Sequence, residues 1–457
     1  MSLVNQLDKQ RIFLKNNFSY VKTRVGLLFK FKGLLLANLD KVFDAYKKDF
    51  NKPADDVYIS EIVPIIDELN FFIKKTKWLS RKKFKWSGFR NSINSNSYIA
   101  TIPYGSVLLI LSHDLILSST LIPLIGAIAA GNTLFIKLPE YSHHLNKIIK
   151  AIVSNIFDEN YVYFVEENQT EDSMKKLYEL DFDLVFFIGK KNSAKTIIKN
   201  FSTKFIDVAY QLSSKCPVII DETANVNLAA KKIIWAKMLN AGQTPYSPNY
   251  LVVHESIYDY LLAALKQEYY KQFGQYDYKT NLTKIYKDES YKVLVKLIEK
   301  HRDRIRFGGE YDDSSRSIQL TLINIDDLKS DLITTEIHGP ILPIIKYNNE
   351  SDIYGIVDLN HSSLAAYVFS KNKTFKNNVK NNISSKTIVF NDSMIQIFYN
   401  IPFGGIRTSG NRTFGKNDSW RLFTYKKLII KASKLSWLSR FKPHADSLKK
   451  IKTKYKL

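Results

Sequence analysis

The chain has 457 residues, 45% of them hydrophobic and 13% aromatic, which excludes a disordered protein and allows two or three lobes with large cores. Its single cysteine, Cys216, excludes an internal disulfide framework and is typical of a reducing cytoplasm. The net charge of +23 fits nucleic acid, a membrane surface or an acidic partner, and also a lysine-rich composition without functional meaning. We favour the compositional explanation and expect no specific nucleic-acid binding, because no basic motif interleaved with aromatic residues stands out.

The N-terminal part of the chain, from residue 3 to about residue 80, is expected to be helical. Residues 3 to about 80 contain an apolar stripe at spacings of three and four residues. The stripe consists of Ile59, Ile62, Ile66, Leu69 and Ile73. Residues 81–100 are polar and basic, and we expect an exposed arm or hairpin there. Residues 115–130 carry no charge, but they contain Pro123 and are shorter than the roughly 20 residues that a membrane-spanning helix needs. They are therefore predicted to form a buried helix packed on a sheet.

Short apolar runs then alternate with segments of helix length. These candidate buried strands cover 106–111, 133–137, 184–188, 217–221, 250–253, 365–369 and 387–390. Strands separated by helices predict a parallel sheet and an α/β fold.

The C-terminal tail is strongly basic. Residues 425–457 contain ten lysines and Arg440 against one acid, Asp446, which gives a net charge of +10. Apolar residues are interleaved with these charges, so the tail can lie on an anionic membrane surface. It can equally pack on a neighbouring subunit, and the sequence leaves both open.

Several short motifs occur in a fixed order along nearly the whole chain. They read LIGAIAAGN at 124–132, FIKLPE at 135–140, FFIG at 186–189, NAGQTP at 240–245, EIHGP at 336–340 and PFGG at 402–405. In this order they resemble the motifs of the aldehyde dehydrogenase superfamily, closest to its fatty-aldehyde (class 3-like) group. The resemblance implies an aldehyde dehydrogenase-like α/β fold with a Rossmann-like cofactor lobe, an α/β catalytic lobe and a small oligomerisation arm.

The resemblance also implies a division of the chain. Residues 1–80 and 101–210 with 391–424 would form the cofactor-binding lobe, and 211–390 the catalytic lobe. Residues 81–100 with 425–457 would form the oligomerisation arm and basic tail. Because the family dimerises through its arm, we expect a homodimer or a heterodimer with an active paralogue.

Three positions that carry the family's chemistry are substituted here. Pro245 stands at the position of the nucleophilic cysteine, and proline has neither a thiol nor a backbone N–H. Gln211 stands at the position of the glutamate that acts as general base, and an amide cannot take up a proton usefully near neutral pH. Asp114 stands at the position of the asparagine that donates to the oxyanion, where a carboxylate would repel the developing charge. Cys216 and Ser247 remain as displaced nucleophiles, although a structural role is expected for both.

The cofactor positions are partly retained. Lys137 and Glu140 match the residues that hold the adenosine ribose in the family, Gly189 ends its F-F-T-G motif, and Glu336 matches the carboxylate that binds the nicotinamide ribose. Lys190 replaces the serine that follows this motif, and His338 replaces a phenylalanine near the nicotinamide. NAD or NADP binding therefore remains open, and no metal is expected.

These observations lead to two functional hypotheses. The first is a family member that has lost NAD(P)-dependent aldehyde oxidation and acts as a binding or regulatory subunit. The alternative is an NAD(P)-dependent oxidoreductase for hydrophobic aldehydes with a rearranged active site. The N-terminus lacks the basic-then-apolar order of a secretory signal, so we expect a cytoplasmic protein, attached to a membrane surface if the tail binds lipid.

Overall fold

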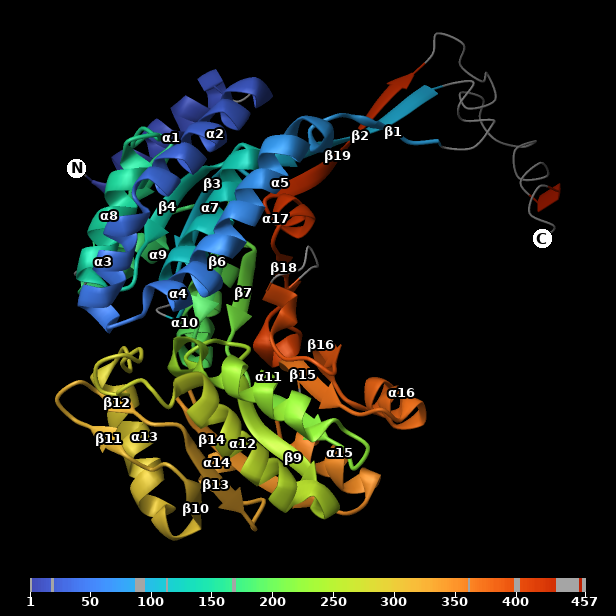
Figure 1. Ribbon diagram of the computed structural model, residues 1–457. Coiled ribbons are helices and arrows are strands. Elements are labelled where there is room, and N and C mark those ends of the chain that lie inside the picture. The colour runs from blue at the N-terminus through green and yellow to red at the C-terminus, as the bar shows by residue number, and fades with distance from the viewer. Residues whose placement is uncertain are drawn as a thin grey trace.

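The computed structural model of the protein describes residues 2–17, 20–86, 95–111, 114–166, 170–360, 362–397, 403–432 and 452–453. Two sheets with their covering helices lie one above the other in Figure 1, and a narrow arm extends from the upper one. This arrangement confirms the predicted α/β fold. No helix in these ranges is both long and apolar enough to cross a membrane.

The upper sheet has five parallel strands in the order β5-β4-β3-β6-β7. The strands are β3 (Ser106–Ile110), β4 (Thr133–Lys137), β5 (Val162–Phe164), β6 (Leu184–Gly189) and β7 (Val208–Leu212). The helices that connect them are α7 (Ile116–Ala130), α8 (His143–Ser154), α9 (Glu171–Glu179) and α10 (Lys191–Ser202). Because β3 pairs with both β4 and β6, the strand order reverses beside β3. Ligands in open α/β sheets bind at the carboxyl ends of the strands near such a reversal.

Alternation along the strands explains why helices cover both faces of this sheet. Val107 and Leu109 pack into the core formed with α2, α5 and α7, whereas Leu108 and Ile110 pack into the core formed with α9 and α10. The N-terminal helices are α1 (Leu3–Asn17), α2 (Val21–Ala37), α3 (Leu39–Phe50), α4 (Ala54–Val57), a π-helical turn (Tyr58–Ile62) and α5 (Val63–Leu79). The predicted buried helix corresponds to α7.

The lower sheet has seven strands in the order β10-β13-β14-β9-β8-β15-β16. They are β8 (Cys216–Ile220), β9 (Pro248–His254), β10 (Ile305–Phe307), β13 (Thr321–Ile325), β14 (Ile341–Tyr347), β15 (Ser363–Phe369) and β16 (Ser385–Phe390), and only β10 runs antiparallel to its neighbour. Around it lie α11 (Val226–Met238), α12 (Tyr258–Phe273), α13 (Asp288–Lys300), α14 (Asp331–Thr334), α15 (Glu350–Asp358) and α16 (Lys373–Asn382). A separate small hairpin consists of β11 (Tyr311–Asp312) and β12 (Ser317–Ile318).

The arm joins two distant parts of the chain. Strands β1 (Lys83–Phe84) and β19 (Thr424–Ala432) both pair antiparallel with β2 (Ser95–Pro103). The expected arm at 81–100 is thus seen in part, and residues 87–94 and most of the basic tail lie outside the described residues. Between the lower sheet and β19 lie β17 (Phe403–Gly404), β18 (Thr413–Phe414) and α17 (Asn417–Leu422), and α17 packs into the core of the upper sheet. The division into lobes remains a prediction that rests on the resemblance.

Candidate active site

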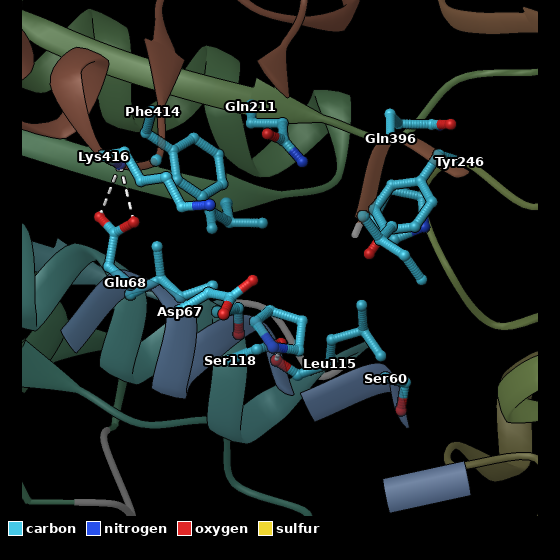
Figure 2. Close-up of a pocket in the computed structure, with 17 residues that line it drawn as sticks. Ser60, Asp67, Glu68, Leu115, Ser118, Gln211, Tyr246, Gln396, Phe414 and Lys416 are labelled. Carbon is cyan, nitrogen blue, oxygen red and sulfur yellow. Dashed lines mark hydrogen bonds between the residues drawn. The ribbon is translucent and has the colours of Figure 1, made fainter. Parts of the chain in front are cut away.

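A cavity of about 130 Å³ contains two of the three substituted catalytic positions in its wall (Figure 2). Pro245 and Gln211 both line it, so the fold brings these positions together. Most of the remaining wall is apolar. Its apolar members are Pro64, Leu115, Ile122, Ile188, Tyr246, Ile397, Phe414 and Gly415, and its polar members are Ser60, Asp67, Glu68, Ser118, Ser119, Gln396 and Lys416. Such a wall suits a ligand with an apolar body.

The loop that carries Pro245 retains a fixed shape. Asn240 and Ala241 both have left-handed backbone conformations, with φ of 54° and 50°. The Asn240 side-chain amide donates hydrogen bonds to the carbonyl oxygens of Asp114 (2.8 Å) and Gln243 (3.0 Å). These bonds supply the local support that a non-glycine residue needs in this conformation. The loop therefore holds its shape without the reactive residue.

Pro245 offers no nucleophile to the cavity, and the only thiol does not replace it. The Cys216 sulfur lies 3.8 Å from the Pro245 carbonyl oxygen, but Cys216 is fully buried in the lower core and is not among the residues that line the cavity. Burial raises the pKa of its thiol to about 12. A thiol in this state is neutral near pH 7 and behaves as a small hydrophobic side chain.

Gln211 and Asp114 occupy different surroundings. Gln211 is the last residue but one of β7 and is 3% exposed, and its side-chain oxygen has no hydrogen-bond partner among the described residues. Asp114 is 8% exposed and precedes α7, but it does not line the cavity. Its negative charge contributes to the raised pKa of His338 and, after burial, to the raised pKa of Tyr246, which lines the cavity. Asp114 is thus joined to the loop that carries Pro245 through the bond from Asn240 to its carbonyl oxygen, although it does not line the cavity.

The residues predicted to hold the adenosine end of a cofactor lie at the carboxyl edge of the upper sheet. Lys137 ends β4, and its ammonium group is 3.1 Å from Glu140. Gly189 ends β6, and α10 begins directly after Lys190. A helix N-terminus at this edge attracts phosphate groups, and Lys190 adds a positive charge there. This end of the site fits a dinucleotide.

The nicotinamide end is altered by an ion pair that sequence reasoning missed. The His338 ring nitrogen lies 2.9 Å from the Glu336 carboxylate. Burial alone would raise the pKa of Glu336, but the charge and hydrogen bond of His338 lower this pKa to about 2. Burial alone would lower the pKa of His338, but Glu336 raises it to about 9. One oxygen of the carboxylate expected to bind a ribose is thus already paired within the protein, which the family pattern does not imply.

Two further polar residues of the cavity were not identified from the sequence. Glu68 is buried on α5 and accepts hydrogen bonds from the Lys416 backbone N–H (2.7 and 2.9 Å) and the Ser419 hydroxyl (2.9 Å). Burial raises its pKa to about 7. Lys416 lies far from Glu68 in the sequence, and none of the family motifs contains either residue. Within the described ranges, no three His, Cys, Asp or Glu side chains form a group that could hold a metal ion.

Comparison with known proteins agrees with this architecture. The aldehyde dehydrogenase family model matches residues 16–429. A 4,4'-diaponeurosporen-aldehyde dehydrogenase of Staphylococcus aureus (strain NCTC 8325 / PS 47) is 32% identical over 432 residues, which cover 92% of this chain and 94% of the relative. A Dictyostelium discoideum protein named aldehyde dehydrogenase family 3 comG is 29% identical over 441 residues, covering 95% and 93%.

A solved structure shows the same architecture over the full length. The substrate-bound state of Staphylococcus aureus AldH has a TM-score of 0.95 and 29% identity to this chain, and the match covers 100% of both chains. The chain therefore belongs to the aldehyde dehydrogenase family and has a family 3 protein among its relatives, as its motifs predicted.

Proposed function

We propose that this protein binds an apolar aldehyde in the cavity without oxidising it through a thiohemiacetal, and that it acts as a binding or regulatory subunit. One observation carries the proposal: the cavity wall at the nucleophile position is Pro245, and the only thiol of the chain, Cys216, is fully buried. Without a nucleophile there is no covalent intermediate, whatever the other groups contribute. The apolar wall of the cavity supports an apolar aldehyde as the ligand.

The test is aldehyde-dependent formation of NADH or NADPH from decanal, followed by absorbance. The wild-type protein is expected to give no signal above a protein-free control. Pro245→Cys alone is expected to give little, because Gln211 supplies no base and Asp114 no oxyanion donor. Turnover is expected to rise when Gln211→Glu and Asp114→Asn are added to it together with His338→Phe, which frees Glu336 for the cofactor, by roughly 10²-fold or more for each restored catalytic group. Clear turnover by the wild-type protein would show the proposal to be wrong.

A second candidate function is an NAD(P)-dependent oxidoreductase that acts on hydrophobic aldehydes through a rearranged site. The comparisons favour this candidate, because the 32% identical relative is named as an aldehyde dehydrogenase and none of the matches speaks for a loss of activity. Its nucleophile would have to be Cys216 or Ser247, both fully buried as the structure stands. Turnover that Cys216→Ala or Ser247→Ala abolishes would establish this candidate, and turnover unchanged in both variants would exclude these two nucleophiles.

Cofactor binding is proposed to be retained at the adenosine end only. Lys137, Glu140, Gly189 and the start of α10 would hold the adenosine and phosphate groups of NAD or NADP, and Glu336 would need to leave His338 before it could bind a ribose. When bound, such a cofactor supplies hydride transfer in the family. Calorimetry with NAD, NADP and adenosine diphosphate is expected to give similar affinities for all three. Much tighter binding of NAD or NADP would show that the nicotinamide end is also engaged.

The assembly state is proposed from the arm. A homodimer or a heterodimer with an active paralogue would form through the sheet β1-β2-β19, and the protein would be cytoplasmic. The basic tail would add contact with an anionic membrane surface. Vesicles that contain anionic lipid should then bind the full chain in a salt-sensitive manner, whereas a chain ending at residue 432 should not bind them.

A further inference from the structure

The cavity contains one amine that the family's chemistry does not use. Lys416 lines the cavity, and Figure 2 shows its side chain extending past Phe414 into the open space. It is the only lysine among the lining residues. Its ammonium group is close enough to Glu68 for its charge to act on the pKa of that carboxyl, and among the described residues it makes no hydrogen bond.

The backbone at Lys416 is held in a conformation that non-glycine residues rarely adopt. Its φ is 57° and its ψ is −118°, and Gly415 before it also has a positive φ of 96°. The conformation is supported by Glu68, whose carboxyl oxygens accept the Lys416 backbone N–H at 2.7 and 2.9 Å. The Ser419 hydroxyl, which accepts the Gly415 N–H at 2.7 Å, fixes the same turn. Strained backbone that several bonds maintain is found preferentially at functional sites. Here it directs the lysine side chain into the cavity.

The surroundings of this amine favour a neutral, apolar ligand with a carbonyl group. Asp67 and Glu68 line the same cavity, so a bound carboxylate would face two acidic side chains as well as one lysine. An aldehyde carries no charge and avoids this repulsion. Its alkyl chain can contact Leu115, Ile122 and Ile188, which lie in the same wall. This inference rests on the proposed function, in which the cavity binds an apolar aldehyde.

We propose that Lys416 captures an apolar aldehyde as an imine. The ammonium group of Lys416 first gives one proton to a carboxylate of the cavity. The amine nitrogen then adds to the carbonyl carbon and forms a carbinolamine, and the carbonyl oxygen leaves as water. The C=O bond breaks and a C=N bond forms. The two protons of the amine leave with the oxygen, so nothing is oxidised or reduced and no cofactor is needed. Glu68, whose pKa of about 7 allows it to exchange protons near neutral pH, and Asp67 are the cavity carboxyls that can relay these protons.

The experiment traps the imine by reduction. The full-length protein is incubated with decanal and sodium cyanoborohydride, which converts an imine into a stable secondary amine, and the modified lysines are identified by peptide mass spectrometry. We expect Lys416 to be modified roughly tenfold or more above the exposed Lys427 with decanal, because burial of the alkyl chain adds to the affinity. With propanal, the two lysines should be modified to a similar extent.

Two variants serve as matched controls. Lys416→Arg keeps the positive charge but cannot form an imine, so the decanal-selective modification should disappear. Lys427→Arg changes an exposed lysine on β19 and should leave it intact. A melting curve of each variant establishes that it is folded. If Lys416→Arg does not fold, the ratio of modification at Lys416 and Lys427 in the wild-type protein still decides the question.

Binding of decanol separates this proposal from the proposed function. Decanol has the same chain but no carbonyl group, and calorimetry measures its binding. If decanol binds and Lys416 is modified no more than Lys427, imine capture is wrong while the apolar site stands. If neither decanol binding nor selective modification is found, both proposals are wrong.

Discussion

At the scale of single residues, the sequence identified which catalytic positions are substituted, but it did not predict which side chains contact one another in the folded protein. The resemblance placed Pro245 and Gln211 at two catalytic positions of the family, and both line the cavity. The pairing of Glu336 with His338 was not predicted. Residues two apart point to the same side only in an extended strand, and this segment lies outside the assigned strands. The sequence also did not predict that the Lys416 side chain extends into the cavity, because this depends on an unusual backbone conformation and on a hydrogen bond to the Glu68 carboxylate of α5.

The Glu336–His338 pair predicts a pH dependence of stability. The pKa of His338 rises from 6.5 to about 9 in the folded protein, so its contribution is fully present below pH 6.5 and is lost as the pH rises towards 9. The loss amounts to at most about 3 kcal/mol. Urea unfolding between pH 6 and 9.5 should therefore show a declining free energy of unfolding. The same series with His338→Gln should decline less, and equal slopes would contradict the pair's role.

At the scale of elements, the sequence pattern predicted the strands that consist of uninterrupted apolar runs and did not predict the others. All seven predicted strands are present, but β5, β7, β10, β13 and β14 of the two sheets were not predicted. Strand β14 contains Pro343, which normally indicates an edge strand, yet it pairs with both β13 and β9. Strand β7 contains Gln211 beside its last residue, and a polar residue weakens the apolar signal of so short a run. These segments form strands because they pair with neighbouring strands in the folded protein, which their local apolar pattern does not show.

The start of α7 depends on a buried acid from the preceding helical region, which leads to a stability prediction. Glu61 accepts the Ser118 N–H at 2.8 Å and pairs with the buried Lys52 at 3.2 Å. Glu61→Gln would leave Lys52 with the Ser60 hydroxyl at 2.9 Å and, as its only carboxylate, the more distant Asp56 at 3.6 Å, so we expect a loss of about 3 kcal/mol in urea unfolding. Asp44→Asn, which breaks an exposed pair with Lys48, should cost less than about 1 kcal/mol. Similar losses in the two variants would contradict this explanation.

At the scale of the whole molecule, the order of strands and motifs predicted the fold class, whereas the arm formed by 81–100 with 425–457 and the dimer were expected from the resemblance alone. The sheet β1-β2-β19 joins residues more than 300 positions apart, as in the pairing of Ile99 with Leu428. No local pattern signals such a pairing. The arm also exposes large apolar side chains, among them Phe84, Trp86, Leu428 and Ile430, with 55%, 66%, 58% and 59% of their surfaces accessible. An exposed group of this size is typical of an interface between chains.

We therefore expect the arm to hold a dimer in solution. Leu428→Asp places a charge in the proposed interface and should convert the dimer into a monomer, as measured by light scattering coupled to size-exclusion chromatography. The melting temperature of the monomer's core should change little, because Leu428 is exposed within its own chain. Leu359→Asp, at an equally exposed position beyond α15, is the matched control and should remain dimeric. A monomeric wild-type protein at micromolar concentration would refute a stable homodimer. In that case the exposed arm residues would point to a different chain as partner, which makes co-purification of a cysteine-bearing paralogue the decisive observation.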